Sequence, residues 1–183
     1  AASERLTVRY PTDLWPNAAD VGRKKSLRFW EHQDALVNLY IEILQICASN
    51  VAEISRAQDV LAWVQERQRV GFSRTTRNED LYCIPDVILS GLTGRVFVEM
   101  DRSTETTQRC CHTAAIYCGY VSRGTYGKEY LDGLPPRVLF VVKTSERKRS
   151  LEHAFLESKD IAHTLVDVVE LWAAAPSIVL SPG

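Results

Sequence analysis

The sequence predicts a mixed α/β domain in which a central sheet is flanked by helices. Two strand-like segments, 87–89 and 96–98, are separated by glycines at a turn, which indicates a β-hairpin. Residues 137–142 (RVLFVV) are apolar without alternation, which is typical of a strand covered on both faces. Segments with helical periodicity precede and follow these strands, and such alternation favours helices packed on the faces of a sheet.

The composition suits one folded domain. With 183 residues, 45% of them hydrophobic, the chain can bury a sizeable core. We expect residues 1–25 to be an N-terminal arm or linker and residues 26–183 to form the domain. Because no apolar run approaches the roughly 20 residues that span a bilayer, and no signal-peptide pattern is present, we expect a cytoplasmic protein with no membrane partner. The five cysteines lack metal-knuckle spacing and are interpreted as reduced thiols.

A long buried helix and a first strand are predicted ahead of the hairpin. Ser26 can cap the helix. Apolar residues recur at helical spacing and form one face, which contains Trp30, Val37, Tyr40, Ile41, Leu44 and Cys47. Leu36, Leu39 and Ile43 widen this apolar face. His32 lies near its start, where a packing or hydrogen-bonding role is more usual than catalysis. Residues 60–66 are predicted as the first core strand and the polar residues 73–80 as a loop.

The elements after the hairpin are predicted in the same way. Ser103 or Thr104 can cap a helix that stops near Gly119 to Gly124. The predicted order then continues with a loop at 122–136, the strand at 137–142, a helix capped by Thr144 or Ser145, a helix at 165–174 ended by Pro176, and a short strand at 178–180. In the helix after 145, Leu151, Ala154 and Phe155 are expected to face inward and Arg147, Lys148 and Arg149 outward.

Three carboxylates on the hairpin are the strongest candidates for chemistry. Asp86 opens the first strand and Glu99 closes the second, so the two ends are neighbours. Since strand side chains alternate with period two, Glu99 and Asp101 point to the same side. Carboxylate oxygens are what a hard divalent cation prefers, which predicts a Mg²⁺ or Mn²⁺ site at Asp86, Glu99 and Asp101, with Glu66 as a further ligand. The alternative is that Asp86 begins a turn, Asp101 caps the next helix and Glu99 pairs with an arginine.

These motifs resemble the PD-(D/E)XK nuclease superfamily, which has a restriction-endonuclease-like αβββαβ core. Pro85-Asp86 matches the PD, and Glu99-Met100-Asp101 stands in the place of (D/E)XK. More narrowly, PDVIL, GRVFVEMDRSTE and PPRVLFVVKTSERKRSLEHAF resemble the plasmid replication-relaxation family of bacteria. The resemblance covers roughly residues 27–180 and is strongest at 95–105 and 137–149. It implies a winged-helix DNA-binding region ahead of this part, so we expect the chain to be a segment of a longer protein.

The resemblance implies roles for individual residues and exposes one departure. Asp101 stands where most of the superfamily has a lysine that orients the attacking water. Arg102 or Lys143 could supply the missing positive charge. The candidate contacts to DNA are Arg102, then Gln108 and Arg109 on the following helix, and Arg147 in the basic cluster at 147–149, against the alternative of ordinary solvated surface.

Two functional hypotheses follow. One is a DNA-binding domain that nicks or cleaves DNA with Mg²⁺ or Mn²⁺ during replication, relaxation or transfer of a plasmid or mobile element. The other is a nuclease-fold module that has lost cleavage and serves in DNA binding or protein assembly. A homodimer or replication and transfer proteins are the expected protein partners. The net charge of −1 gives no overall attraction to nucleic acid, so either hypothesis relies on local basic clusters.

Overall fold

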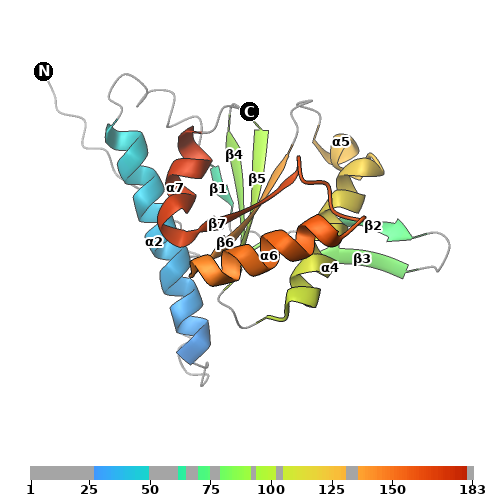
Figure 1. Cartoon of the computed structure of the whole chain (residues 1–183). Coiled ribbons are helices and arrows are strands. Elements are labelled where there is room, and N and C mark those ends of the chain that lie inside the picture. Colours follow the sequence, from blue (N-terminus) through green and yellow to red (C-terminus); the bar gives the residue numbers. More distant parts are fainter. Residues whose placement is uncertain are drawn as a thin grey trace, which may run out of the picture.

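The computed structural model describes residues 27–49, 62–64, 70–74, 79–91, 94–101, 105–130 and 136–180 (Figure 1). The predicted arm at 1–25, the cap at Ser26 and the candidate site residues Glu66 and Arg102 lie outside these ranges. No helix in the described part of the chain is long and apolar enough to cross a membrane.

A five-stranded mixed sheet forms the centre of the domain. Its strand order is β1 (Ala62–Val64), β4 (Val87–Gly91), β5 (Gly94–Asp101), β6 (Arg137–Val142) and β7 (Val166–Glu170). The pairs β1–β4 and β4–β5 are antiparallel, whereas β5–β6 and β6–β7 are parallel. The α/β class is therefore confirmed, and so is the predicted hairpin, because β4 pairs with β5 from Val87 opposite Val98 to Gly91 opposite Gly94.

Helices cover both faces of this sheet. In Figure 1, α2 (Leu27–Ser49) and α7 (Leu171–Leu180) lie side by side on one face, and α4 (Thr107–Ser122) and α6 (Ser145–Glu157) lie on the other, with the short α5 (Thr125–Glu129) beyond α4. Two cores result, one on each face. Strand β6 belongs to both, since Val138, Phe140 and Val142 face the α4–α6 core and Leu139 and Val141 face the α2–α7 core. This confirms a strand covered on both faces.

The buried face of α2 is rotated relative to the prediction, and the side chains of Trp30, Leu44 and Cys47 lie outside the described residues. Leu36, Leu39 and Ile43 are at most 1% exposed, and each contributes roughly 1.5–3 kcal/mol by leaving water. Tyr40 is buried as expected, but Ile41 is 39% exposed. Leu36, Leu39 and Ile43, which were predicted to widen the apolar face, therefore form its centre.

Two predicted loops contain regular structure. The ends of the predicted loop at 73–80 belong to β2 (Val70–Arg74) and β3 (Glu79–Cys83), which pair antiparallel as a separate two-stranded sheet, beside α4 in Figure 1. Within 122–136, α5 follows Gly124, whose φ of 74° suits a glycine. The α5 turn forms where Tyr126 packs edge-on against Phe97 and Tyr120, so an aromatic contact and not a helical period organises this segment.

The C-terminal prediction was right only in that a helix is present, because this helix begins and ends later than expected and the final strand is absent from the described residues. Residues Val166–Glu170 are the edge strand β7, with Val166 and Val168 buried and Asp167 exposed, which is a period of two. Helix α7 then runs through Pro176 to Leu180 and replaces the expected strand at 178–180. Proline inside a helix removes one backbone hydrogen bond, but Ala174 and Ala175 of the same helix are fully buried, and this packing keeps the chain helical.

The cysteines in the described residues carry free thiols. They are Cys83, Cys110, Cys111 and Cys118, as predicted for reduced residues; the side chain of Cys47 lies outside the described part. Burial raises the pKa of the Cys83 and Cys110 thiols to about 12, helped by the nearby charges of Glu99 and Asp101 respectively. Both thiols are therefore protonated and unreactive at neutral pH.

The β2–β3 ribbon is attached to the domain at a glycine of α4. A Cβ atom added to Gly119 would lie 2.1 Å from Cε1 of Phe72, so the ring of Phe72 needs the space that the glycine leaves. The guanidinium of Arg123 lies 4.6 Å from the centroid of the same ring and covers it.

We predict that Gly119→Ala destabilises the protein by about 1–3 kcal/mol, because the new methyl group must displace Phe72. Gly127→Ala is the matched control, since the added atom at Gly127 meets nothing within 4 Å. It should be neutral or stabilising by up to about 1 kcal/mol. Urea unfolding measures both, and equal effects of the two substitutions would contradict this attachment.

Candidate functional site

The candidate site lies at the edge of the sheet where the parallel strands end. Asp101 is opposite Val142 in the β5–β6 ladder, so β5 and β6 finish together. Helices α4 and α6 begin at the same edge. Thr144 caps α6 as predicted, by accepting a hydrogen bond from the backbone N–H of Arg147. The cap of α4 is Thr106 and not Ser103 or Thr104, and it accepts from the N–H of Arg109.

Asp86 is held in a fixed orientation beside β5. Its backbone N–H donates to the carbonyl of Val98 at 3.0 Å. Its Oδ2 accepts from the backbone N–H of Met100 at 2.7 Å, and its Oδ1 lies 3.0 Å from Nε2 of His32 on α2. Side chains of His32 and Asp86 are about a quarter exposed, at 25% and 26%. The carboxylate is therefore positioned from two elements and still reaches solvent.

Glu99 lies next to Asp86 and carries an unfavourable charge. Its Oε1 accepts a hydrogen bond from the hydroxyl of Tyr117 at 2.5 Å. Burial raises the pKa of Glu99 well above its usual value, and the negative charge of Asp86 raises it further. Among the described residues, Oε2 of Glu99 accepts no hydrogen bond. Two adjacent carboxylates with one oxygen to spare fit a divalent cation, which would neutralise the charge that they impose on each other.

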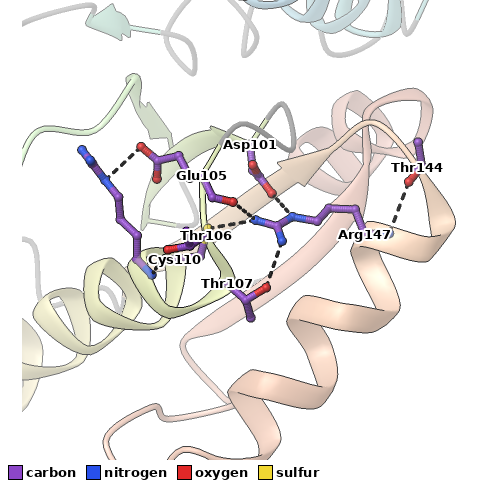
Figure 2. Close-up of polar contacts among 8 residues, drawn as sticks. Asp101, Glu105, Thr106, Thr107, Cys110, Thr144 and Arg147 are labelled. Atoms are coloured by element: carbon purple, nitrogen blue, oxygen red, sulfur yellow. Dashed lines mark hydrogen bonds and ion pairs between the residues drawn. The ribbon is translucent and has the colours of Figure 1, made fainter.

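Asp101 forms an ion pair with Arg147 (Figure 2). Nε of Arg147 donates to Oδ2 of Asp101 at 2.5 Å, and the side chains of Asp101 and Arg147 are only 3% and 13% exposed. The rest of the guanidinium is also used. Nη1 donates to the hydroxyl of Thr107 at 3.0 Å, and Nη2 donates to the carbonyl of Glu105 at 2.8 Å and lies 3.5 Å from the sulfur of Cys110.

The prediction that Arg147 points outward was wrong. Burial by itself would lower the pKa of the guanidinium, but the hydrogen bond and charge of Asp101 outweigh it and raise that pKa, so Arg147 stays charged. Its donors join the end of β5 to the first turns of α4 and α6. These contacts use four of the five N–H donors of the guanidinium, so at most one donor is left for the expected phosphate contact of Arg147.

The three acids therefore divide into a pair and a separate ion pair. Among the described residues, no three His, Cys, Asp or Glu side chains are grouped so that they could hold a metal ion. This differs from the expectation that Asp86, Glu99 and Asp101 converge. The physical reason is that Arg147, which comes from α6, offers Asp101 a buried opposite charge.

The other predicted residues are exposed at or near the same edge. Lys143 follows Val142 at the end of β6 and is exposed. Gln108 and Arg109 are exposed on the first turn of α4, where Nε of Arg109 pairs with Glu105 at 3.1 Å. These three side chains are accessible to an anionic ligand.

Two residues of the site were not predicted as part of it. His32 was interpreted as a packing or hydrogen-bonding residue, and it is the partner of Asp86. Tyr117 lies three positions after Ala114 on the buried face of α4, and its burial raises the pKa of its hydroxyl, as do the neighbouring Glu99 and Cys83. The hydroxyl of a tyrosine on a buried helical face needs a polar partner, and this requirement could have predicted that Tyr117 contacts a polar residue of the site.

Comparisons with protein-family models, with curated proteins and with solved structures give no match for this chain. The family resemblance of the motifs thus stays an expectation from the sequence.

We predict that Arg147→Met destabilises the protein by about 3–5 kcal/mol, because it leaves the carboxylate of Asp101 buried without a partner. Arg149→Met is the matched control, since Arg149 is 73% exposed and its pair with Glu146 is exposed too; it should cost less than about 0.5 kcal/mol. Chemical unfolding measures both. Adding Asp101→Asn to Arg147→Met should recover part of the loss, and a fully additive double variant would argue against the pair.

We predict that Glu99→Gln stabilises the metal-free protein at about pH 7, because glutamine removes a carboxylate whose ionised form is disfavoured by burial and by the charge of Asp86. The pKa of Glu99 is raised in the folded state, so the folded protein favours the neutral carboxyl and loses stability as the pH rises through that pKa. Glutamine is neutral throughout and can still accept from Tyr117. The gain should vanish below about pH 4, where glutamate is protonated in both states. Unfolding in EDTA across this range tests it, and a gain independent of pH would refute the charge argument.

Proposed function

We propose that this domain binds DNA and nicks or cleaves it with a divalent cation, as a PD-(D/E)XK-like nuclease of the replication-relaxation type, acting on a plasmid or mobile element in the cytoplasm. The observation that carries the proposal is the Asp86–Glu99 pair. Two half-buried carboxylates lie at the ends of neighbouring strands, and the negative charge of Asp86 adds to the burial that disfavours the ionised form of Glu99. A stable domain rarely keeps such a pair without a use for it.

The arrangement of elements supports the same proposal. Without the β2–β3 ribbon and α5, the chain runs α2, β1, β4, β5, α4, β6, with Asp86 at the start of β4 and Glu99 near the end of β5. This order is compatible with the αβββαβ core that the motifs PD and EMD imply. The strand at 137–142, which carries part of the resemblance, lies next to β5 in the sheet.

Asp86 and Glu99 would hold Mg²⁺ or Mn²⁺, together with substrate phosphate and water. When bound, the cation would supply charge neutralisation on the phosphodiester and an activated water. The chain's own residues prepare this site. Met100 and His32 orient the carboxylate of Asp86, and Tyr117 fixes that of Glu99, so that both acids are positioned before a ligand arrives.

Exposed side chains at the strand edge would bind the DNA backbone. Lys143 is the strongest candidate, because it follows Val142, which pairs with Asp101 in the ladder, and is exposed without an ion pair among the described residues. Gln108 and Arg109 extend the contact along α4. In this proposal Arg147 has a structural role and fixes the helix ends against the sheet, while Lys143 offers the charge that Asp101 cannot.

The second candidate is a nuclease-fold module that binds DNA or a protein partner, a second copy of the chain included, without cleavage. One observation favours it. Asp101 stands in the place of the superfamily's lysine and is neutralised by Arg147, so this position offers neither a third metal ligand nor a free cation to the reaction. The nicking assay below separates the two candidates.

We predict that the protein converts supercoiled plasmid to the relaxed form with Mg²⁺ or Mn²⁺ but not in EDTA. Asp86→Asn and Glu99→Gln should each lower the rate by at least about 100-fold, because each removes a cation ligand. Asp167→Asn makes the same chemical change at an exposed position of β7 and should retain activity. Nicking that persists in both site variants would reject this site. An inactive wild-type protein that still binds DNA would favour the second candidate.

A further inference from the structure

A concave site lies on the side of α4 that faces the β2–β3 ribbon and the turn after α6. Its volume is about 530 Å³, which falls in the range of roughly 300–1,000 Å³ usual for small-ligand sites. Three structural units form it: α4, the ribbon residues Phe72 and Leu81, and residues 159–162 between α6 and β7. The acids Asp86 and Glu99 do not line it, so it is separate from the site described above.

The floor of this hollow is apolar and is made by side chains from all three units. Ile116 and Ile161 are buried, and Phe72 and Leu81 are half-buried. The ribbon is held in place here, because Phe72 lies against Gly119. A planar apolar group could therefore lie on a floor that is already formed.

The rim of the hollow is polar and carries a net positive charge. It contains Arg123, Lys159, Asp160, Ser122 and His112, which gives two cations against one carboxylate when the imidazole is neutral. Among the described residues, the side chains of His112, Ser122, Lys159 and Asp160 make no hydrogen bond or ion pair. The guanidinium of Arg123 is kept in position by the ring of Phe72.

We propose that this hollow binds a nucleotide, with the base on the apolar floor and the phosphate between Lys159 and Arg123. An apolar floor that ends in two cations complements a flat, partly apolar base that carries an anionic phosphate. The hydroxyl of Ser122 can donate to or accept from the hydrogen-bonding edge of the base, and the carboxylate of Asp160 can accept from an amino group of the base. The nucleotide is either a free mononucleotide or one unit of a DNA strand, and the second source rests on the proposed function.

Titration of the full chain with dAMP in EDTA, followed by calorimetry, tests the proposal. We expect saturable binding that is at least about tenfold weaker in Lys159→Glu, which reverses a rim charge, and in Ser122→Trp, which fills the hollow from an exposed helix position. Lys128→Glu reverses an exposed charge on α5, outside the hollow, and should bind as wild type does. Circular dichroism and unfolding check that all three variants are folded.

Deoxyadenosine and inorganic phosphate should each bind at least about tenfold more weakly than dAMP, because each satisfies half of the site. No saturable dAMP binding, unchanged binding in the folded Lys159→Glu and Ser122→Trp variants, or phosphate binding as tight as that of dAMP would each overturn the proposal.

The two sources are distinguished with a single-stranded oligonucleotide. If Ser122→Trp weakens its binding, the nucleotide comes from a strand; if only dAMP binding is lost, the ligand is a free nucleotide, and both results support the site. Asp86→Asn should leave dAMP binding in EDTA unchanged. A protein that fails to nick DNA but binds dAMP therefore rejects the proposed nuclease function and not this inference.

Discussion

The buried ion pair between Asp101 and Arg147 is the interaction on which the site end of the domain depends. Taking two charges out of water is costly, and the pair persists because each of the three guanidinium nitrogens has a hydrogen-bond partner. Those partners belong to the end of β5 and the start of α4, while Arg147 itself belongs to α6. The pair thus sets where both helices begin relative to the sheet, and with them the position of Tyr117 against Glu99.

Helix α4 serves two sites through different sides. Its sheet-facing side carries Tyr117, which fixes Glu99, and its outer side carries Gly119 and Arg123, which receive the β2–β3 ribbon and border the nucleotide hollow. The small residue at 119 permits the close approach of Phe72, so the ribbon forms one wall of the hollow. Because both sites are built on the same helix, the position of the hollow relative to the carboxylate pair is fixed.

Most of the central sheet could be predicted because its signals are local. The glycine-bounded hairpin and the unbroken apolar run at 137–142 specify β4, β5 and β6 from neighbouring residues alone. The β2–β3 ribbon was missed because its polar residues resemble a loop, and its stability comes from packing on α4. Strand β7 was missed although Val166, Asp167 and Val168 alternate, since a short pattern at a chain end also suits a helix. Pro176 was predicted to end a helix but lies inside α7, because a proline ends a helix only where burial does not stabilise the helix.

By itself, the sequence determined the hairpin, and with it the prediction that Asp86 and Glu99 are neighbours at its open end. It also determined that Asp101 lies at the end of the same strand. Only the tertiary structure decided what each acid does there. The partner of Asp101 comes from a helix 46 positions later in the chain, and the partners of Asp86 and Glu99 come from α2 and α4. Charge pairing in a buried site depends on which side chains from different helices and strands come into contact, and no local sequence pattern specifies these contacts.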